Sequence, residues 1–98
     1  MIISSQRYLD NAIVTAKMGE LAGETSVTLS VYDVEVDGET MQVLFDGHHT
    51  YTAAQELGIE VKFETVRHPE DLTGIDLLEA SWNDSDWYDI ETEINVWN

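Results

Sequence analysis

An Asp-Gly pair at positions 37 and 38 restricts the folds open to this chain more than any other feature of its sequence. Both central residues of a type I′ turn need positive φ, which glycine adopts freely and aspartate tolerates, so the pair is a strong signal for a tight hairpin. Apolar and polar residues alternate up to Val36 before the pair and over 39–45 after it. We therefore expect two antiparallel strands joined by this turn.

The first of these two runs changes its apolar parity part of the way along. Its apolar residues are at odd positions first and at even positions later: Val27, Leu29 and Val31, then Tyr32, Val34 and Val36. Successive side chains of a strand point to opposite faces of a sheet, so the change predicts a bulge or a break near Val31.

Three segments have the residue spacing of helices. Apolar residues three and four apart predict an amphipathic helix over 5–18, capped by Ser4 or Ser5. A second helix is expected over 49–57, where the following glycine would end it, and a third over 70–80. The expected inward residues are Leu9, Ala12, Ile13 and Ala16 in the first helix, and Tyr51, Ala53, Ala54 and Leu57 in the second.

Two further segments alternate as strands do. One is 59–66, which ends before Pro69, and the other is 87–97, which has acidic residues at alternate positions and suits an edge strand. We therefore expect one domain over 1–98 of the α+β class, with a small mixed β-sheet and two or three helices.

Acidic residues dominate the composition: 20 acidic residues stand against four Lys and Arg, for a formal net charge of −16. A chain with 43% hydrophobic residues, three Trp and four Tyr is too apolar to be disordered, so the charge is expected on the surface of a folded core. Such a surface repels nucleic acid and anionic lipid, so we expect no direct contact with nucleic acid and no contact with membranes. The expected partners are basic protein surfaces.

Several classes of function are excluded by residues that the chain lacks. It has no cysteine, which excludes disulfides, thiol nucleophiles and cysteine-based zinc sites. No basic leader precedes an apolar stretch, and no segment has the roughly 20 apolar residues that span a bilayer. We expect a cytoplasmic protein without a cofactor, in the host cytoplasm if a phage encodes it.

A turn of five residues joins the returning strand of the hairpin to the second helix: Asp46, Gly47, His48, His49 and Thr50. With its flanking elements, it makes residues 34–66, about a third of the chain, resemble the N-terminal domain of the ParB family and the related sulfiredoxin fold. The resemblance implies a ParB/sulfiredoxin-like fold in which the glycine backbone and the helix start lie against a phosphate. Relatives usually place an arginine where this chain has Thr50, and sulfiredoxin places its cysteine where this chain has His48. The turn is therefore expected to be a vestigial phosphate-binding turn, without sulfiredoxin activity.

The adjacent histidines of this turn allow two interpretations. With Asp46 they could bind a metal ion, or one could act as a general base near neutral pH. Neighbouring side chains point in different directions, however, and the chain has no metal-binding spacing such as two histidines four residues apart. We favour the interpretation in which one imidazole packs at the helix start and the other is exposed, and we assign no catalytic residue and no metal ligand.

The C-terminal third carries the second candidate site, because no Lys or Arg follows His68. On an extended strand, alternate residues lie about 6.6 Å apart on one face, so the acids of 87–97 would form a regular negative row. Trp87 and Trp97 share the parity of that row and would anchor it in a cleft lined by Lys and Arg. A solvated acidic face is the other interpretation. The expected partner-binding residues are Asp84, Asp86, Trp87, Asp89, Glu91 and Glu93.

The sequence thus predicts a non-enzymatic acidic inhibitor that mimics nucleic acid and blocks a basic nucleic-acid-binding machine. Its size, its charge and its lack of catalytic residues are like those of phage-encoded anti-CRISPR and anti-restriction proteins. The alternative is a ParB-like domain that binds nucleotide or DNA, or cleaves DNA, through the turn at 46–50. A homodimer formed through the last strand, and an assembly partner encoded beside a basic protein, also stay open.

Overall fold

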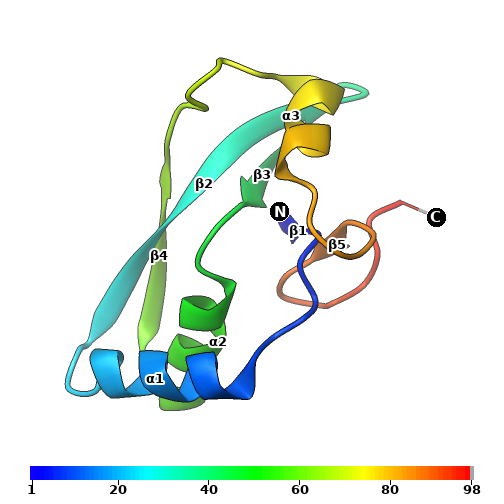
Figure 1. Ribbon diagram of the computed structural model, residues 1–98. Helices are drawn as coiled ribbons and strands as arrows, with labels where there is room; N and C mark the ends of the chain where they lie inside the picture. Colours follow the sequence, from blue (N-terminus) through cyan, green and yellow to red (C-terminus); the bar gives the residue numbers. More distant parts are fainter. Residues whose placement is uncertain (98) are drawn as a thin grey trace.

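The computed structural model describes residues 1–97, which form a five-stranded mixed sheet with three helices (Figure 1). The expected α+β class is confirmed. The strands are β1 (Ile2–Ser4), β2 (Ser26–Val36), β3 (Glu39–Leu44), β4 (Glu60–Thr65) and β5 (Tyr88–Asp89), and the helices are α1 (Asn11–Leu21), α2 (His48–Leu57) and α3 (Gly74–Ser81). None of these helices is long and apolar enough to cross a bilayer.

The strand order across the sheet is β4-β2-β3-β1-β5. β2 pairs with β3 in the antiparallel sense and with β4 in the parallel sense, while β1 lies parallel to β3 and antiparallel to β5. The hairpin turn is where the sequence predicts it, with Asp37 at φ 52° and Gly38 at φ 81°. The long β2–β3 hairpin therefore forms the centre of the sheet.

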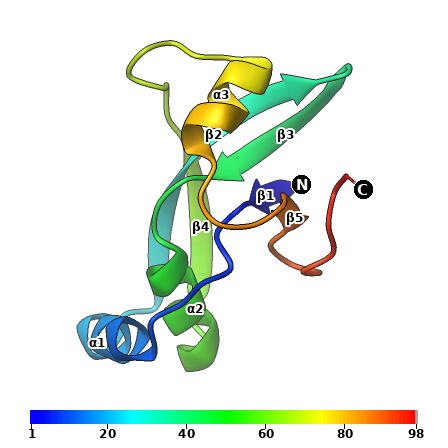
Figure 2. The same cartoon turned by 45° about the vertical axis from the view of Figure 1, so that its right-hand side comes forward.

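β2 runs unbroken over 11 residues, so the expected bulge or break near Val31 is wrong. Val31 lies in an apolar cluster against which Tyr51 of α2 packs. The next residue, Tyr32, points to the other face and lies in a second cluster with Leu77 of α3. The parity changes because helices cover opposite faces of β2 at its two ends, with α2 at one end and α3 at the other, while α1 packs on α2 (Figures 1 and 2).

The N-terminal segment differs from its prediction. Residues Ile2–Ser4 form β1, a strand too short to leave a periodic signal, and α1 begins only at Asn11. The helix is capped by Asp10, whose Oδ1 accepts a hydrogen bond from the backbone N–H of Ala12 at 2.8 Å. Ser4, at the end of β1, and Ser5 are both buried, and neither is the cap of α1.

The expected inward face of α1 is also wrong. Val14 is its one buried residue, while Ile13 is 42% exposed. α2 follows its prediction more closely, because it starts one residue early and ends at Gly58, which has φ 70°. Leu57, expected to point inward, is exposed.

The segment 87–97, expected as one strand, is instead a short strand followed by a loop that returns to it. β5 has two residues, and Glu93 then adopts φ 64°. The returning backbone pairs with the outgoing one through the N–H of Asp89, which donates to the carbonyl of Ile94 at 3.0 Å. The expected edge position is confirmed for β5 itself, which ends the strand order.

Arg7 accounts for the shape of this loop. Its Nη2 donates to the backbone carbonyl of Glu93 at 2.9 Å and to Oδ1 of Asn95 at 3.2 Å. Its guanidinium also lies 4.0 Å from the ring centre of Tyr88. One cation thus holds the turn and the start of the loop together, which an extended strand would not allow.

Candidate functional site

The acidic residues of the tail do not form the predicted row. Asp89 is half-buried and its Oδ1 accepts the backbone N–H of Glu91 at 2.9 Å, so the chain already turns between these two residues. Glu91 and Glu93 are exposed on the turn. Burial raises the pKa of Tyr51, and the carboxylates of Glu91, Asp89 and Glu93 raise it further. The three acids are therefore gathered near one tyrosine.

Asp84, another expected contact residue, has an internal partner. Its two carboxylate oxygens accept the backbone N–H groups of Arg7 at 2.8 Å and Tyr8 at 3.3 Å. This carboxylate therefore fixes the segment between β1 and α1. Asp86 is exposed at the surface, as its predicted role requires.

A regular pair of carboxylates lies instead on β2, where the sequence analysis assigned no site. Asp33 and Glu35 are exposed and point to the same side as Val31, beyond the part of the sheet that α2 covers. Their partners across the hairpin are Gln42 and Thr40. We call Asp33, Glu35, Thr40 and Gln42 the open hairpin face.

The open hairpin face has the geometry that was expected of the tail. Residues two apart on a strand are about 6.6 Å apart on one face, so Asp33 and Glu35 present their carboxylates at a fixed spacing. Gln42 holds the first of them, because its Nε2 donates to Oδ1 of Asp33 at 3.1 Å. Strand pairing thus sets the positions of these charges more firmly than a loop would.

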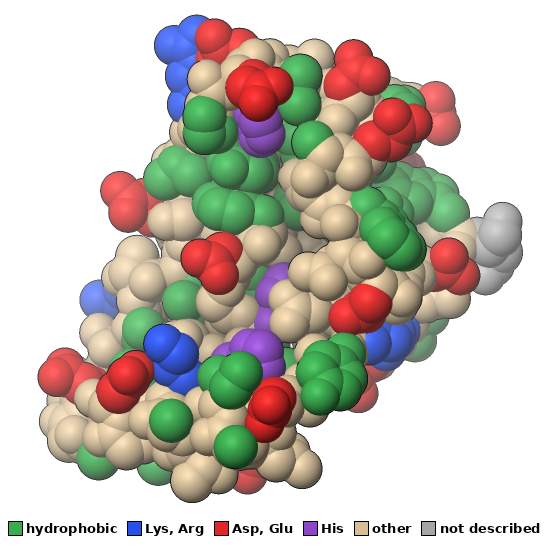
Figure 3. All heavy atoms as spheres, viewed as in Figure 1, with side chains coloured by type: hydrophobic (Ala, Val, Ile, Leu, Met, Phe, Trp, Pro, Cys, Tyr) green, Lys and Arg blue, Asp and Glu red, His purple; other side chains and the backbone are tan. Residues whose placement is uncertain are grey.

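Few of the acidic side chains have a basic partner. Among residues 1–97 the ion pairs are Lys17–Glu20, at 3.4 Å and exposed on α1, and Arg67–Asp71, also exposed. Only two of the 20 acidic side chains are therefore neutralised in this way. Figure 3 shows the Asp and Glu side chains spread over one face of the molecule with few Lys or Arg between them. The surface field remains strongly negative.

The turn at 46–50 has the backbone that its glycine predicts. Gly47 has φ 90°, and a Cβ added there would lie 3.1 Å from Cδ2 of Leu29, so a larger residue would be both strained and crowded. The N–H of Gly47 donates to Oδ1 of Asp46 at 2.8 Å. A carboxylate of the chain itself thus occupies one backbone donor at the helix start.

The two histidines of the turn point to different partners, as expected of neighbouring residues. His48 is buried and shares a hydrogen bond between its Nε2 and the hydroxyl of Ser4, while its Nδ1 is buried without a partner in residues 1–97. Burial lowers the pKa of His48 to about 4, against the opposing effect of Asp46, so the ring is neutral at neutral pH. The packing role is therefore confirmed for His48.

His49 is half-buried, so the expectation that it is exposed is wrong. Its Nε2 accepts the backbone N–H of Asp10 at 3.1 Å, which ties the start of α2 to the cap of α1. The described residues contain no group of three or more His, Asp or Glu side chains placed to hold a metal ion. Both imidazoles therefore form hydrogen bonds that hold parts of the fold together.

A polar hollow of about 380 Å³ lies beside this turn. Thr50 and His49 contribute to its lining from α2, and Lys17 contributes from α1. Lys17 is the one basic residue of that lining, and no spacing in the sequence indicates that it lies near the turn.

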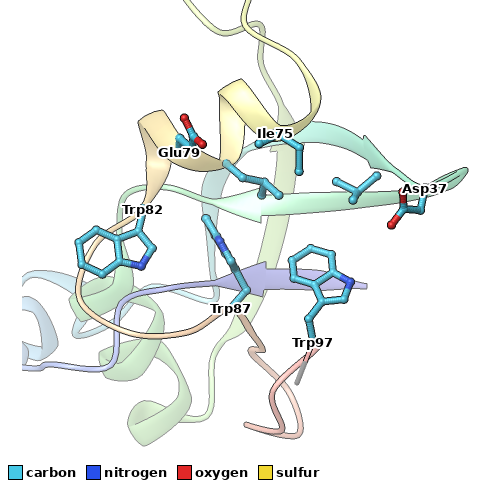
Figure 4. Close-up of a pocket in the computed structure, with 8 residues that line it drawn as sticks. Asp37, Ile75, Glu79, Trp82, Trp87 and Trp97 are labelled. Carbon is cyan, nitrogen blue, oxygen red and sulfur yellow. The ribbon is translucent and has the colours of Figure 1, made fainter.

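An apolar recess of about 410 Å³ lies between α3, the end of β2 and the tail (Figure 4). We call it the tryptophan recess, and its lining residues are Val36, Asp37, Ile75, Leu78, Glu79, Trp82, Trp87 and Trp97. Trp87, predicted to contact a partner, also packs against the core cluster beneath α3. The sequence indicates neither Trp82 nor α3 as part of this surface.

Comparison of the chain with protein-family models, with curated proteins and with solved structures finds no significant match. The resemblance of residues 34–66 to the ParB and sulfiredoxin fold therefore stays a prediction.

Proposed function

We propose that this chain is a non-enzymatic acidic protein that occupies the nucleic-acid-binding surface of a basic protein and so blocks it. One observation carries the proposal: two of the 20 acidic side chains have an ion-pair partner in the described residues. Ordinary soluble surfaces mix the two signs of charge. A surface of nearly one sign attracts a partner of the opposite sign from a distance and binds it in a salt-dependent way.

The open hairpin face is the part of this surface best suited to the contact. Strand pairing fixes the backbone of Asp33 and Glu35, so no backbone freedom has to be lost there when Lys or Arg of the partner pairs with them. The exposed acids Asp86, Glu91 and Glu93 at the tail add charge without a fixed row. Binding through both regions would cover a cleft that otherwise takes a phosphate backbone.

The proposal is tested by capture followed by competition. The protein is immobilised, basic proteins are captured from a lysate at low salt and released at high salt, and each captured protein is then offered its own DNA or RNA. We expect the chain to displace that nucleic acid. If captured proteins keep their nucleic acid in the presence of excess chain, the proposal is wrong.

Charge-reversed variants locate the contact. Asp33→Lys with Glu35→Lys reverses the charge of the open hairpin face, while Glu60→Lys with Glu64→Lys makes the same change at exposed positions of the edge strand β4. We expect the first pair to lose competition and the second to keep most of it. Equal losses would mean that net charge alone governs the binding.

The hollow beside Lys17 favours a second candidate, which is binding of a nucleotide or DNA phosphate at the turn 46–50. A helix start and a nearby lysine form a suitable environment for an anion, which would compete with Asp46 for the N–H of Gly47 and with Glu20 for Lys17. Titration with CTP, ATP and short DNA, with and without Mg²⁺, separates the two functions. The first proposal expects no saturable binding and no turnover, whereas the second expects binding that Lys17→Gln weakens.

A further inference from the structure

We infer that the tryptophan recess binds an arginine side chain of the basic partner. The inference rests on the proposed function, since it names the point at which that partner is anchored. It starts from three exposed apolar residues in one recess: Trp82 is 57% exposed, Ile75 is 58% exposed and Trp97 is 38% exposed. Large apolar groups gathered in a hollow mark an interaction surface more often than single exposed ones do.

The recess is built from three elements that hold it open. Trp82 ends α3, and its indole N–H donates to the carbonyl of Ser85 at 3.0 Å, which fixes the ring. Trp87 and Trp97 come from the two ends of the tail loop, and the N–H of Val96 donates to the carbonyl of Trp87 at 2.9 Å, which keeps those ends together. Figure 4 shows the three indoles below α3, with Trp87 between Trp82 and Trp97, and all three line the recess. The site is therefore largely formed before a partner arrives.

Two carboxylates complete the lining, and their sign selects the occupant. Glu79 lies on α3, and Asp37 lies at the hairpin turn. Both are exposed, neither has an ion-pair partner in residues 1–97, and the recess has no Lys or Arg in its lining. A purely apolar side chain bound in the recess would take water away from these two carboxylates without replacing it, whereas a cationic side chain would form ion pairs with them. Charge complementarity therefore indicates a cationic side chain.

Arginine fits this combination better than lysine. A guanidinium is planar, is weakly hydrated, stacks on aromatic faces and donates in a fork to carboxylates. The chain already makes this contact once, where the guanidinium of Arg7 lies 4.0 Å from the ring centre of Tyr88. A recess of about 410 Å³ has room for the whole side chain and part of its backbone. The negative charge spread over the surface would then speed association with the partner, and the arginine bound in the recess would give specificity.

The test uses a peptide that alternates glycine and arginine, and the same peptide with citrulline, a neutral isostere, in place of arginine. Binding to the full chain is measured by tryptophan fluorescence and calorimetry at physiological ionic strength. Trp82→Ala with Trp97→Ala is expected to weaken binding of the arginine peptide by about tenfold, because cation–π contacts are lost. The citrulline peptide is expected to bind far more weakly than the arginine peptide.

A second pair of variants separates the recess from net charge. Asp37→Asn with Glu79→Gln removes two charges from the recess and keeps a residue that tolerates positive φ at the turn. Glu60→Gln with Glu64→Gln removes two charges elsewhere on the surface, at exposed positions of β4 outside both proposed contact regions. We expect about a tenfold loss for the first pair and about a twofold loss for the second. Circular dichroism and thermal unfolding check that every variant is folded.

Three results would overturn the inference: equal losses for the two charge pairs, equal binding of the citrulline peptide, or no measurable binding of the arginine peptide by the unmodified chain. None of them decides the proposed function, which stands or falls on the displacement of nucleic acid from a captured protein. Conversely, arginine binding that depends on Trp82 and Trp97 would survive a failure of that competition.

Discussion

The imidazole of His48 shares a hydrogen bond with the hydroxyl of Ser4 in the core, and this contact joins the first turn of α2 to β1. Both residues are buried, and burial lowers the pKa of His48 to about 4 from its ordinary value of 6.5. The unfolded chain therefore binds a proton at this residue between pH 6.5 and 4, where the folded chain does not. A proton that favours the unfolded state destabilises the fold as the pH falls.

We expect the contribution of His48 to the free energy of unfolding to be complete above pH 6.5 and to fall by about 3 kcal/mol as the pH drops to 4. The measurement is the difference between the native chain and His48→Gln in urea unfolding at several pH values, since protonation of the many acids affects both proteins alike. We expect the free energy of unfolding of the native chain to fall, relative to that of His48→Gln, as the pH drops from 6.5 to 4. A difference that does not change between pH 6.5 and 4 would contradict the burial of a neutral ring at His48.

Arg7 should matter more to stability than the other arginine of the chain. It donates to Glu93 and Asn95 and lies over the ring of Tyr88, so Arg7→Met should lower the free energy of unfolding by about 1–2 kcal/mol. Arg67→Met removes only an exposed ion pair on the surface and should cost less than about 0.5 kcal/mol. Urea unfolding measures both values. Hydrogen exchange should also speed up in the tail loop of the Arg7 variant, and an unchanged loop would contradict the role assigned to this residue.

The sequence predicts those elements of the fold whose signals are local. The Asp37 and Gly38 turn, the extent of α2 with Gly58 behind it, and β4 all follow from residues within the element itself. The tail differs from its prediction because its shape is set by Arg7, more than 80 residues away, which donates to the carbonyl of Glu93. Alternation alone does not distinguish a strand from a loop that returns on itself.

The candidate sites also differ in whether their sequence signals are local or depend on distant residues. Asp33 and Glu35 continue the odd-numbered positions of β2 and therefore lie on the same strand face as Val31. The sequence predicts the open hairpin face once the strand is known to be continuous. The bulge or break expected near Val31 hides this face, because a break in the strand would end that run of odd-numbered positions. The tryptophan recess has no such signal, since Trp82 and Trp97 meet only through the packing of α3 and the tail.

Gly47 and Gly19 should respond in opposite ways to alanine. Gly47 has φ 90° and faces Leu29 closely, so Gly47→Ala should destabilise the fold by about 1–3 kcal/mol. Gly19 lies inside α1 with nothing within 4 Å of an added Cβ, so Gly19→Ala should stabilise it by about 0.5–1 kcal/mol. Thermal and urea unfolding of the two variants give the comparison. A loss of stability at Gly19 would contradict the position of α1.

Salt should stabilise this chain. With a net charge of −16 and only two ion pairs in the described residues, repulsion between carboxylates opposes the compact state, and added ions screen it. The melting temperature should therefore rise steadily with NaCl. MgCl₂ at equal ionic strength separates screening from specific binding: equal increases indicate screening, and a larger, saturable increase indicates a cation site on the acidic surface.

Asp33→Asn with Glu35→Gln should melt at a higher temperature at low salt and respond less to NaCl, because these two neighbouring charges repel each other across one strand face. A melting temperature that does not depend on salt would mean that the carboxylates are too far apart to act as one field, and it would remove the main physical support for long-range attraction to a basic partner.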